Sequence, residues 1–266
     1  MPTSLRPLAY GALALLALAG AMALALMLSS SNTDVANAQS SGSIPASKAA
    51  VAVDELIALS QTAGADAGDP SDAGTTGWVD VLETQIKTSQ QKDLNIIAAL
   101  QTGVVTDNTV SSKNGGLSSS TARGTVSVRV LVDDDPAEPD NSIDANKATA
   151  PGVVYQDRIA KLEARFSGLN CTADLETGAV TCEDPEMLRL LMKSLNANSF
   201  NFVKMDVGSG VHTVTVQAKA DAAADIFQDD PFGGTLAGAE AFTGAGSVLV
   251  EEVRYVKGTD PIVDLE

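Results

Sequence analysis

The sequence predicts an all-β fold: an antiparallel β-sandwich, jelly-roll-like or immunoglobulin-like, with one short helix, preceded by a signal peptide and a flexible linker. Three observations lead to this prediction. Apolar residues alternate with polar ones over strand-length runs, as in residues 125–132, where Val126, Val128 and Val130 share one face. Turn residues separate these runs at short intervals, which is typical of sandwiches. A continuous apolar stretch, residues 8–28, lies near the N-terminus.

The N-terminal region has the pattern of an export signal. Arg6 precedes the apolar stretch, and Ala36 and Ala38 fit a small-residue cleavage site, so we expect the mature chain to begin at Gln39. The stretch is also long enough to span a bilayer, and an uncleaved membrane anchor is the alternative. We therefore divide the chain into a signal peptide (1–38), a largely disordered linker (39–77), a sandwich domain (78–256) and a C-terminal tail (257–266).

The linker is rich in Ser, Ala, Gly and Asp, the composition of a spacer. Residues 47–61 interrupt it and fit either a short helix or a strand. The first strands of the sandwich are expected at residues 78–88 and 93–105, because Leu94, Ile96 and Ala98 recur with a period of two. Residues 155–167 fit both periods, and the surrounding strands favour a strand there.

The helix is expected to start at Asp184, which can cap the first turn, with Pro185 in the first helical position. Its core face would consist of Leu188, Leu191, Met192 and Leu195. Residues 198–220 then predict a β-hairpin with its turn at residues 206–210, because Phe200 and Phe202 alternate with polar residues before the turn, and His212, Val214, Val216 and Ala218 do so after it. Residues 221–246 are expected to form a Gly/Ala/Asp-rich excursion before a last strand at 247–256.

The composition restricts the class of partner. The chain has 34 Asp and Glu against 17 Lys and Arg, a net charge of −17, which argues against binding to a nucleic-acid backbone. An acidic surface instead suits solubility, divalent cations or high salt, and the charge alone does not choose among these. We expect the partner to be an extracellular protein or a glycan, with contact to a membrane only if the N-terminal segment is uncleaved.

Cys171 and Cys182 are the two cysteines of the chain. In an exported protein this spacing, with Thr177 and Gly178 as turn residues between them, predicts a disulfide. A redox-active pair is the weaker alternative, because there is no Cys-x-x-Cys motif and neither cysteine has a basic neighbour.

His212 is the single histidine, and its place in an alternating strand predicts a partly buried structural role. A Ser-His-Asp site would also need a serine nucleophile, and no Gly-x-Ser-x-Gly motif occurs. We therefore identify no catalytic residue.

The acidic loops are the main candidate sites. Asp133, Asp134, Asp135, Glu138 and Asp140, with Asp144 beyond, follow directly from a strand, and Asp225, Asp229 and Asp230 form a second cluster. Calcium takes six to eight oxygen ligands in flexible geometry, so the first loop is a candidate calcium site. The EF-hand spacing is absent, and solvated surface charge is the alternative interpretation.

The segments Phe200-Asn201-Phe202, 210–214 and 246–253 resemble exported bacterial proteins of uncharacterised activity with a predicted sandwich domain. The resemblance implies compartment and fold, and brings no site residues. From the residues we expect a secreted, periplasmic or cell-surface module that is non-catalytic and presents acidic loops for binding or surface structure. The alternatives are an extracellular hydrolase that uses loop carboxylates and a surface-layer or filament subunit.

Overall fold

A computed structural model describes residues 48–55, 59–112, 116–139, 152–165, 171–173, 176, 180–182, 186–229 and 234–255. The expected signal peptide lies outside these residues. The described part is all-β with no helix, so no helix in it could cross a membrane. Its strands are β1 (Ala49–Asp54), β2 (Ser60–Ala65), β3 (Ser71–Thr75), β4 (Val79–Thr88), β5 (Lys92–Ser112), β6 (Leu117–Val132), β7 (Asp135–Pro136), β8 (Val153–Arg165), β9 (Cys171–Ala173), β10 (Val180–Cys182), β11 (Glu186–Val207), β12 (Gly210–Gln228) and β13 (Leu236–Val253).

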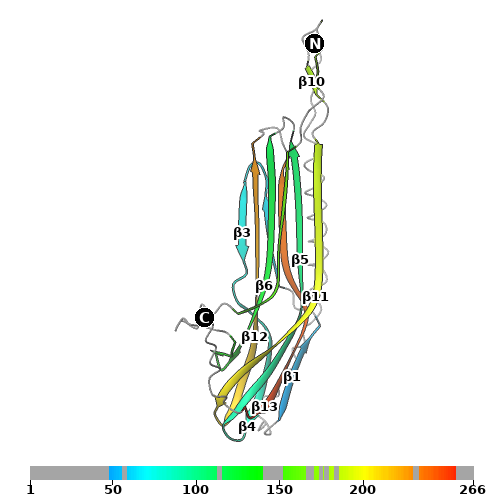
Figure 1. The fold of residues 1–266 in the computed structure, drawn as a ribbon. Helices are drawn as coiled ribbons and strands as arrows, with labels where there is room; N and C mark the ends of the chain where they lie inside the picture. Colours follow the sequence, from blue (N-terminus) through cyan, green and yellow to red (C-terminus); the bar gives the residue numbers. More distant parts are fainter. Residues whose placement is uncertain are drawn as a thin grey trace, which may run out of the picture. The chain divides into compact units, whose positions relative to one another are not determined.

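The strands form two antiparallel sheets that pack face to face (Figure 1). Sheet A has the order β1-β13-β5-β11, and β2 pairs with β13 beside β1. Sheet B has the order β3-β12-β6-β7, with β4 also on β12 and β8 on β6. Strands β9 and β10 form a separate small hairpin. The β-sandwich architecture is therefore confirmed.

The core lies between the two sheets and follows the predicted alternation. Side chains at alternate positions of β5 and β6 are fully buried, including Ile96, Val126 and Val128, and the same holds for Val214 and Val216 on β12. A second cluster is built mainly from alanines of β2, β6, β12 and β13. Small side chains let the sheets come close there: a Cβ on Gly124 would lie 2.7 Å from Cγ1 of Val104.

The predicted helix is wrong. The residues from Glu186 onward form strand β11, which pairs with β5 from Glu186 opposite Ser112 to Val207 opposite Lys92. The backbone of a short helix forms hydrogen bonds only within the helix, and an isolated short helix is marginally stable. As a strand, this segment pairs along its whole length with the central strand β5, so tertiary pairing overrides local propensity.

The predicted hairpin is also wrong, although its turn is in the right place. Strand β11 ends at Val207 and β12 begins at Gly210, but β11 belongs to sheet A and β12 to sheet B, so the turn connects two sheets. The alternation cannot reveal this, because both strands bury one apolar face in the same core.

Other segments differ in extent. Residues 221–246 are largely strand, because β12 and β13 extend through them with alanine and glycine in place of large side chains. Strands β1, β2 and β3 lie in the segment whose composition predicts a spacer. Of the helix and strand alternatives for residues 47–61, residues 49–54 form strand β1. The strand favoured near residues 155–167 is confirmed as β8.

Candidate functional site

The first predicted site, the acidic loop, begins as a tight turn. Val132 pairs with Asp135, which leaves Asp133 and Asp134 as a two-residue turn, and both have positive φ (50° and 64°). Such turns match the twist of the flanking strands, and Asp tolerates this backbone conformation better than most residues do. The acidic residues are therefore partly explained by the turn itself.

The carboxylate of Asp133 is engaged by the start of β12. Its Oδ2 lies 2.7 Å from Nδ1 of His212, and its Oδ1 accepts a hydrogen bond from the backbone N–H of Thr213 at 2.9 Å. Partial burial acts to raise the pKa of Asp133, but the hydrogen bonds from His212 and Thr213 outweigh it and hold that pKa below its usual value. The contact ties the β6–β7 turn to β12.

The other ring nitrogen of His212 is also occupied. Nε2 lies 3.0 Å from the carbonyl oxygen of Gly208, and only 12% of the side chain is exposed. A general base of the Ser-His-Asp type needs Nε2 directed at a hydroxyl nucleophile. In the described structure this nitrogen faces the turn between β11 and β12, so His212 links two turns.

The remaining acidic residues of this loop have separate partners. Asp135 forms an ion pair with Lys204 of β11, and the ammonium group also donates to the carbonyl of Pro136 at 2.8 Å. Burial lowers the pKa of Lys204, although the charge of Glu138 opposes this. The backbone of Glu138 bridges Val203.

The described part of the loop thus directs Asp133 and Asp135 to different side chains. Asp140 and Asp144 lie outside the described residues, as does Asp230 of the second cluster. Among the residues that the structure does describe, no group of three or more Asp, Glu, His or Cys side chains could hold a metal ion. The calcium site at Asp133, Asp134, Asp135, Glu138 and Asp140 stays a prediction.

The cysteines lie on the β9–β10 hairpin. The backbone register places Cys171 directly opposite Cys182. Their side chains are outside the described structure, and the disulfide stays a prediction.

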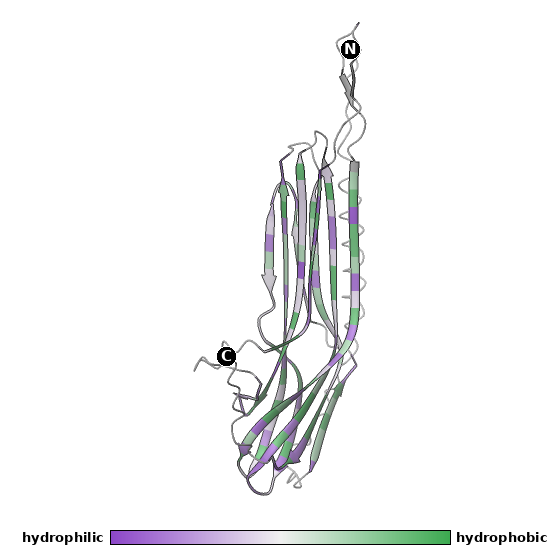
Figure 2. Ribbon diagram, viewed as in Figure 1, coloured by the Kyte–Doolittle hydropathy of each residue, from purple (hydrophilic) through white to green (hydrophobic). Residues whose placement is uncertain are grey.

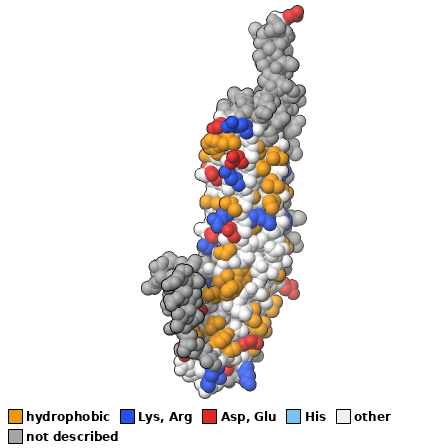
Figure 3. All heavy atoms as spheres, viewed as in Figure 1, with side chains coloured by type: hydrophobic (Ala, Val, Ile, Leu, Met, Phe, Trp, Pro, Cys, Tyr) orange, Lys and Arg blue, Asp and Glu red, His pale blue; other side chains and the backbone are white. Residues whose placement is uncertain are grey.

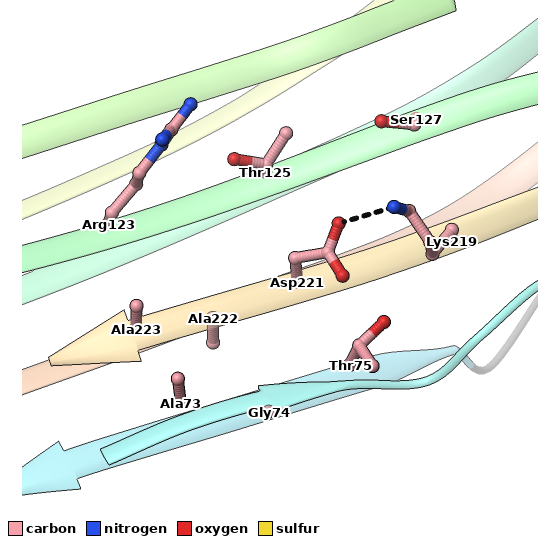
Figure 4. A pocket seen from close by; sticks show the side chains of 10 residues that line it. All are labelled: Ala73, Gly74, Thr75, Arg123, Thr125, Ser127, Lys219, Asp221, Ala222 and Ala223. Atoms are coloured by element: carbon pink, nitrogen blue, oxygen red, sulfur yellow. Dashed lines mark ion pairs between the residues drawn. The ribbon is translucent and has the colours of Figure 1, made fainter. Parts of the chain in front are cut away.

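A shallow groove of about 580 Å³ lies on the outer face of sheet B, between side chains of β3, β6 and β12 (Figure 4). Arg123 makes two hydrogen bonds to Asp157, of 3.0 and 3.1 Å, and Lys219 lies 3.1 Å from Asp221. The bond from Arg123 is the main reason that the pKa of Asp157 lies below its usual value. The charged side chains that line the groove are thus paired with neighbouring charges, and the groove does not assemble a set of reactive groups.

Sequence reasoning missed a buried polar network between β5, β8 and β11. The Thr102 hydroxyl donates to Gln156 at 3.0 Å, and Asn198 donates to the hydroxyl of Thr102 at 3.1 Å and to the backbone carbonyl of Tyr155 at 3.0 Å. Further along, Asn108 donates to the carbonyl of Ala160 at 3.1 Å. The network holds β8 against β5 and ends at the side of β11. The sequence pattern that could have revealed this network is the presence of polar residues at alternate positions of β11.

Beyond this network, β11 exposes apolar side chains on both faces. Met187, Leu191 and Leu195 are 67%, 59% and 49% exposed on the outer face of sheet A. Leu188, Leu190 and Met192, on the face that points toward sheet B, are 47%, 37% and 39% exposed. Figure 2 shows that much of β11 is coloured as hydrophobic, and Figure 3 shows hydrophobic side chains exposed on the surface of the sandwich. We call residues 187–195 of this strand the β11 edge.

The β11 edge also carries backbone groups that have no partner in the described part of the chain. Within the described residues β11 pairs as a strand with β5 alone, and its one other backbone pairing there is the isolated bridge between Glu138 and Val203. In that bridge both the N–H and the C=O of Val203 point away from β5. The register has no irregularity from Glu186 to Lys204, so the same groups of Met187, Arg189, Leu191, Lys193 and Leu195 point to the free side. A long, flat, apolar edge of this kind is a template for another strand.

No protein family matches the sequence, and no curated protein matches it. Among solved structures, a chain in a structure of the infectious bursal disease virus Gx strain aligns with 83% of this chain and 49% of its own length, at 8% identity and a TM-score of 0.12. The present chain thus spans about half the length of the viral one. A TM-score of this size carries no argument about fold or function.

Proposed function

We propose that the chain is an exported, non-catalytic binding or surface-structural module, located outside the cytoplasm or at the cell surface, and that it acts through the β11 edge. The observation that supports this is the coincidence, on one strand, of exposed apolar side chains on both faces with backbone N–H and C=O groups that have no partner among the described residues. Exposed apolar patches mark interaction sites, and free edges accept strands. The acidic turn would then be a second, solvent-facing surface.

We propose that the sandwich is a jelly roll. If β1 with β2 and β3 with β4 each count as one interrupted strand, eight strands remain, apart from the short β7 and the β9–β10 hairpin. In chain order they give sheets 1-8-3-6 and 2-7-4-5. Support comes from this order, because pairs of Greek keys in a jelly roll distribute consecutive strands between two four-stranded sheets in this way. The immunoglobulin-like alternative, with seven or nine strands in another order, fits less well.

The experiment compares two charge substitutions on opposite edges of sheet A. Leu191→Lys changes the β11 edge, and Val53→Lys is the matched control, because Val53 is 70% exposed on edge strand β1. Both proteins are expressed in the source cells, and the fraction retained on washed cells or in large complexes is measured by quantitative immunoblotting. We expect retention to fall several-fold for Leu191→Lys and to stay unchanged for Val53→Lys. Equal retention of both variants and the unmodified protein would refute a role for the β11 edge.

Organisation of the acidic turn by calcium is a separate proposal. Thermal unfolding at fixed ionic strength, first with millimolar calcium and then with chelator, tests it. A ligand that binds only the folded state stabilises it by about 2.7 kcal/mol at a hundred times its dissociation constant. An upward shift that Asp133→Asn removes would support the site, and the absence of a shift would leave these carboxylates as turn residues and surface charge.

A further inference from the structure

We propose that the β11 edge pairs antiparallel with the β11 edge of a second copy of this chain, across a two-fold axis. This inference rests on the proposed function and names the partner of the same surface. An isologous contact of this kind needs a strand that is self-complementary in backbone, shape and charge. The β11 edge meets each requirement.

The backbone requirement follows from the geometry of the strand. The N–H and C=O groups of alternate residues from Met187 to Leu195 point to the free side, without proline or bulge. A second antiparallel β11 presents the same groups with the same spacing, so both rows of donors and acceptors become paired.

The exposed area matches that of a dimer contact. Met187, Leu188, Leu190, Leu191, Met192 and Leu195 are between 37% and 67% exposed. With full areas of roughly 200 Å² for such side chains, they expose roughly 600 Å² of apolar surface over the two faces of the strand. A stable interface buries about 800 Å² per partner, so these side chains with the paired backbone supply the area that one two-fold contact needs.

The charge of the strand also fits a second copy. The chain as a whole carries −17, which opposes self-association at most of its surface. Between Met187 and Val203 there is no acidic residue, and the two cations are Arg189 and Lys193. Asp107 of β5 neutralises Arg189, with its Oδ1 2.8 Å from Nε. Two copies therefore meet at β11 with little net charge.

Side-chain chemistry selects one register. With Leu190 opposite Leu190 of the second copy, Leu188 meets Met192 on the inner face, and Arg189 and Lys193 lie opposite Leu191 and Met187 on the outer face. A shift that centres Leu191 places Arg189 opposite Lys193, and like charges directly opposite are destabilising. A shift that centres Met192 places Leu190 opposite Ser194. The Leu190-centred register is therefore the favoured one.

The experiment measures the oligomeric state of the exported protein, with its N-terminus defined by intact mass, by sedimentation equilibrium over roughly 1–100 µM. We expect a concentration-dependent dimer. Leu191→Pro removes an N–H that points to the free side and leaves the ladder to β5 intact, so it should weaken dimerisation at least tenfold. Val53→Lys, on the opposite edge, should dimerise like the unmodified protein. A circular-dichroism unfolding curve for each variant shows that the sandwich still folds.

A second measurement tests the register. Directly opposed residues in a non-hydrogen-bonded antiparallel pair have Cα atoms about 4.5 Å apart, close enough for a disulfide. Leu190→Cys should therefore form a covalent dimer under mild oxidation, whereas Leu195→Cys should not. Cross-linking at 195 but not at 190 would overturn the proposed register.

Three outcomes would overturn the inference. A monomer at all concentrations would show that β11 does not bind its own copy. Oligomers of increasing size that are absent in the Val53→Lys variant would indicate a head-to-tail contact instead of a two-fold one. The unmodified protein could also fail to self-associate while Leu191→Lys still lowers cell-surface retention. That result would overturn the dimer and leave the proposed function in place, with a different partner on the same edge.

Discussion

The register of β11 on β5 can be tested with two phenylalanines of the same face. Phe202 lies opposite Ile96 and is fully buried, whereas Phe200 lies opposite Ala98 and is 39% exposed. Their rings contact each other edge to face, with centroids 5.5 Å apart. Replacing either one with alanine removes the same ring contact, worth about 0.5–1.5 kcal/mol, so that contribution cancels in the comparison.

The expected difference between the two variants comes from burial. Phe202→Ala loses a fully buried ring and leaves a closed cavity, which destabilises by about 3–5 kcal/mol. Phe200→Ala loses about three fifths of a ring's burial at a site open to water, or about 1–2 kcal/mol. The free energy of unfolding should therefore differ by about 2–3 kcal/mol between the variants.

Urea unfolding followed by tryptophan fluorescence and by circular dichroism measures both values. The slope against urea should be unchanged, because the same surface becomes exposed on unfolding. Equal losses, or a larger loss for Phe200→Ala, would mean that β11 is shifted by two residues along β5, and the assignment of the exposed β11 residues would fail with it.

Three further predictions concern other parts of the sandwich. Gly124→Ala should lower the free energy of unfolding by about 1–3 kcal/mol, because its Cβ would lie 2.7 Å from Val104, whereas Gly208→Ala, with nothing within 4 Å, should change it by less than about 0.5 kcal/mol. The pKa of Asp133 is lower in the folded state than its unfolded value of about 3.9, so the stability it contributes is fully present above that pH and is lost as the pH falls through the folded pKa. The stability gap between the unmodified protein and Asp133→Asn should therefore narrow in denaturation curves below about pH 4, and a constant gap would contradict this. Non-reduced protein should have a mass about 2 Da below the reduced form and no thiol that reacts with iodoacetamide, and modification of Cys171 or Cys182 would disprove the disulfide.

Much of the fold is predictable because a buried strand face leaves a period-two signal. The fully buried valines of β6 and β12 and the alternating residues of β5 are all visible in the sequence. The pairing of these strands is not, because alternation fixes which face is buried but not which strand lies alongside. The turn at residues 208–209 shows this: it was located correctly, yet it joins two sheets instead of two paired strands.

The small-residue half of the core left a weaker signal. Ala222, Ala224, Ala237 and Ala239 are buried, but alanine is neutral in a hydropathy pattern and common in spacers. The acidic turn was found as a cluster of charge, whereas its geometry comes from positive φ and from a partner, His212, that lies far away in sequence. No local pattern encodes such a contact.

The wrong helix and the proposed interface have the same origin. A strand with one buried face shows apolar residues at every second position. The sequence from Met187 to Leu195 has apolar residues at both odd and even positions, a pattern that also fits the apolar face of a helix. Both faces of this segment are exposed in the structure, so the core formed by the described residues does not explain its composition. A strand that is apolar on both faces is instead typical of the interior of a sheet, with neighbours on both sides. β11 has the sequence of such an interior strand and, in one copy, the position of an edge, and a second strand on its free side would resolve that conflict.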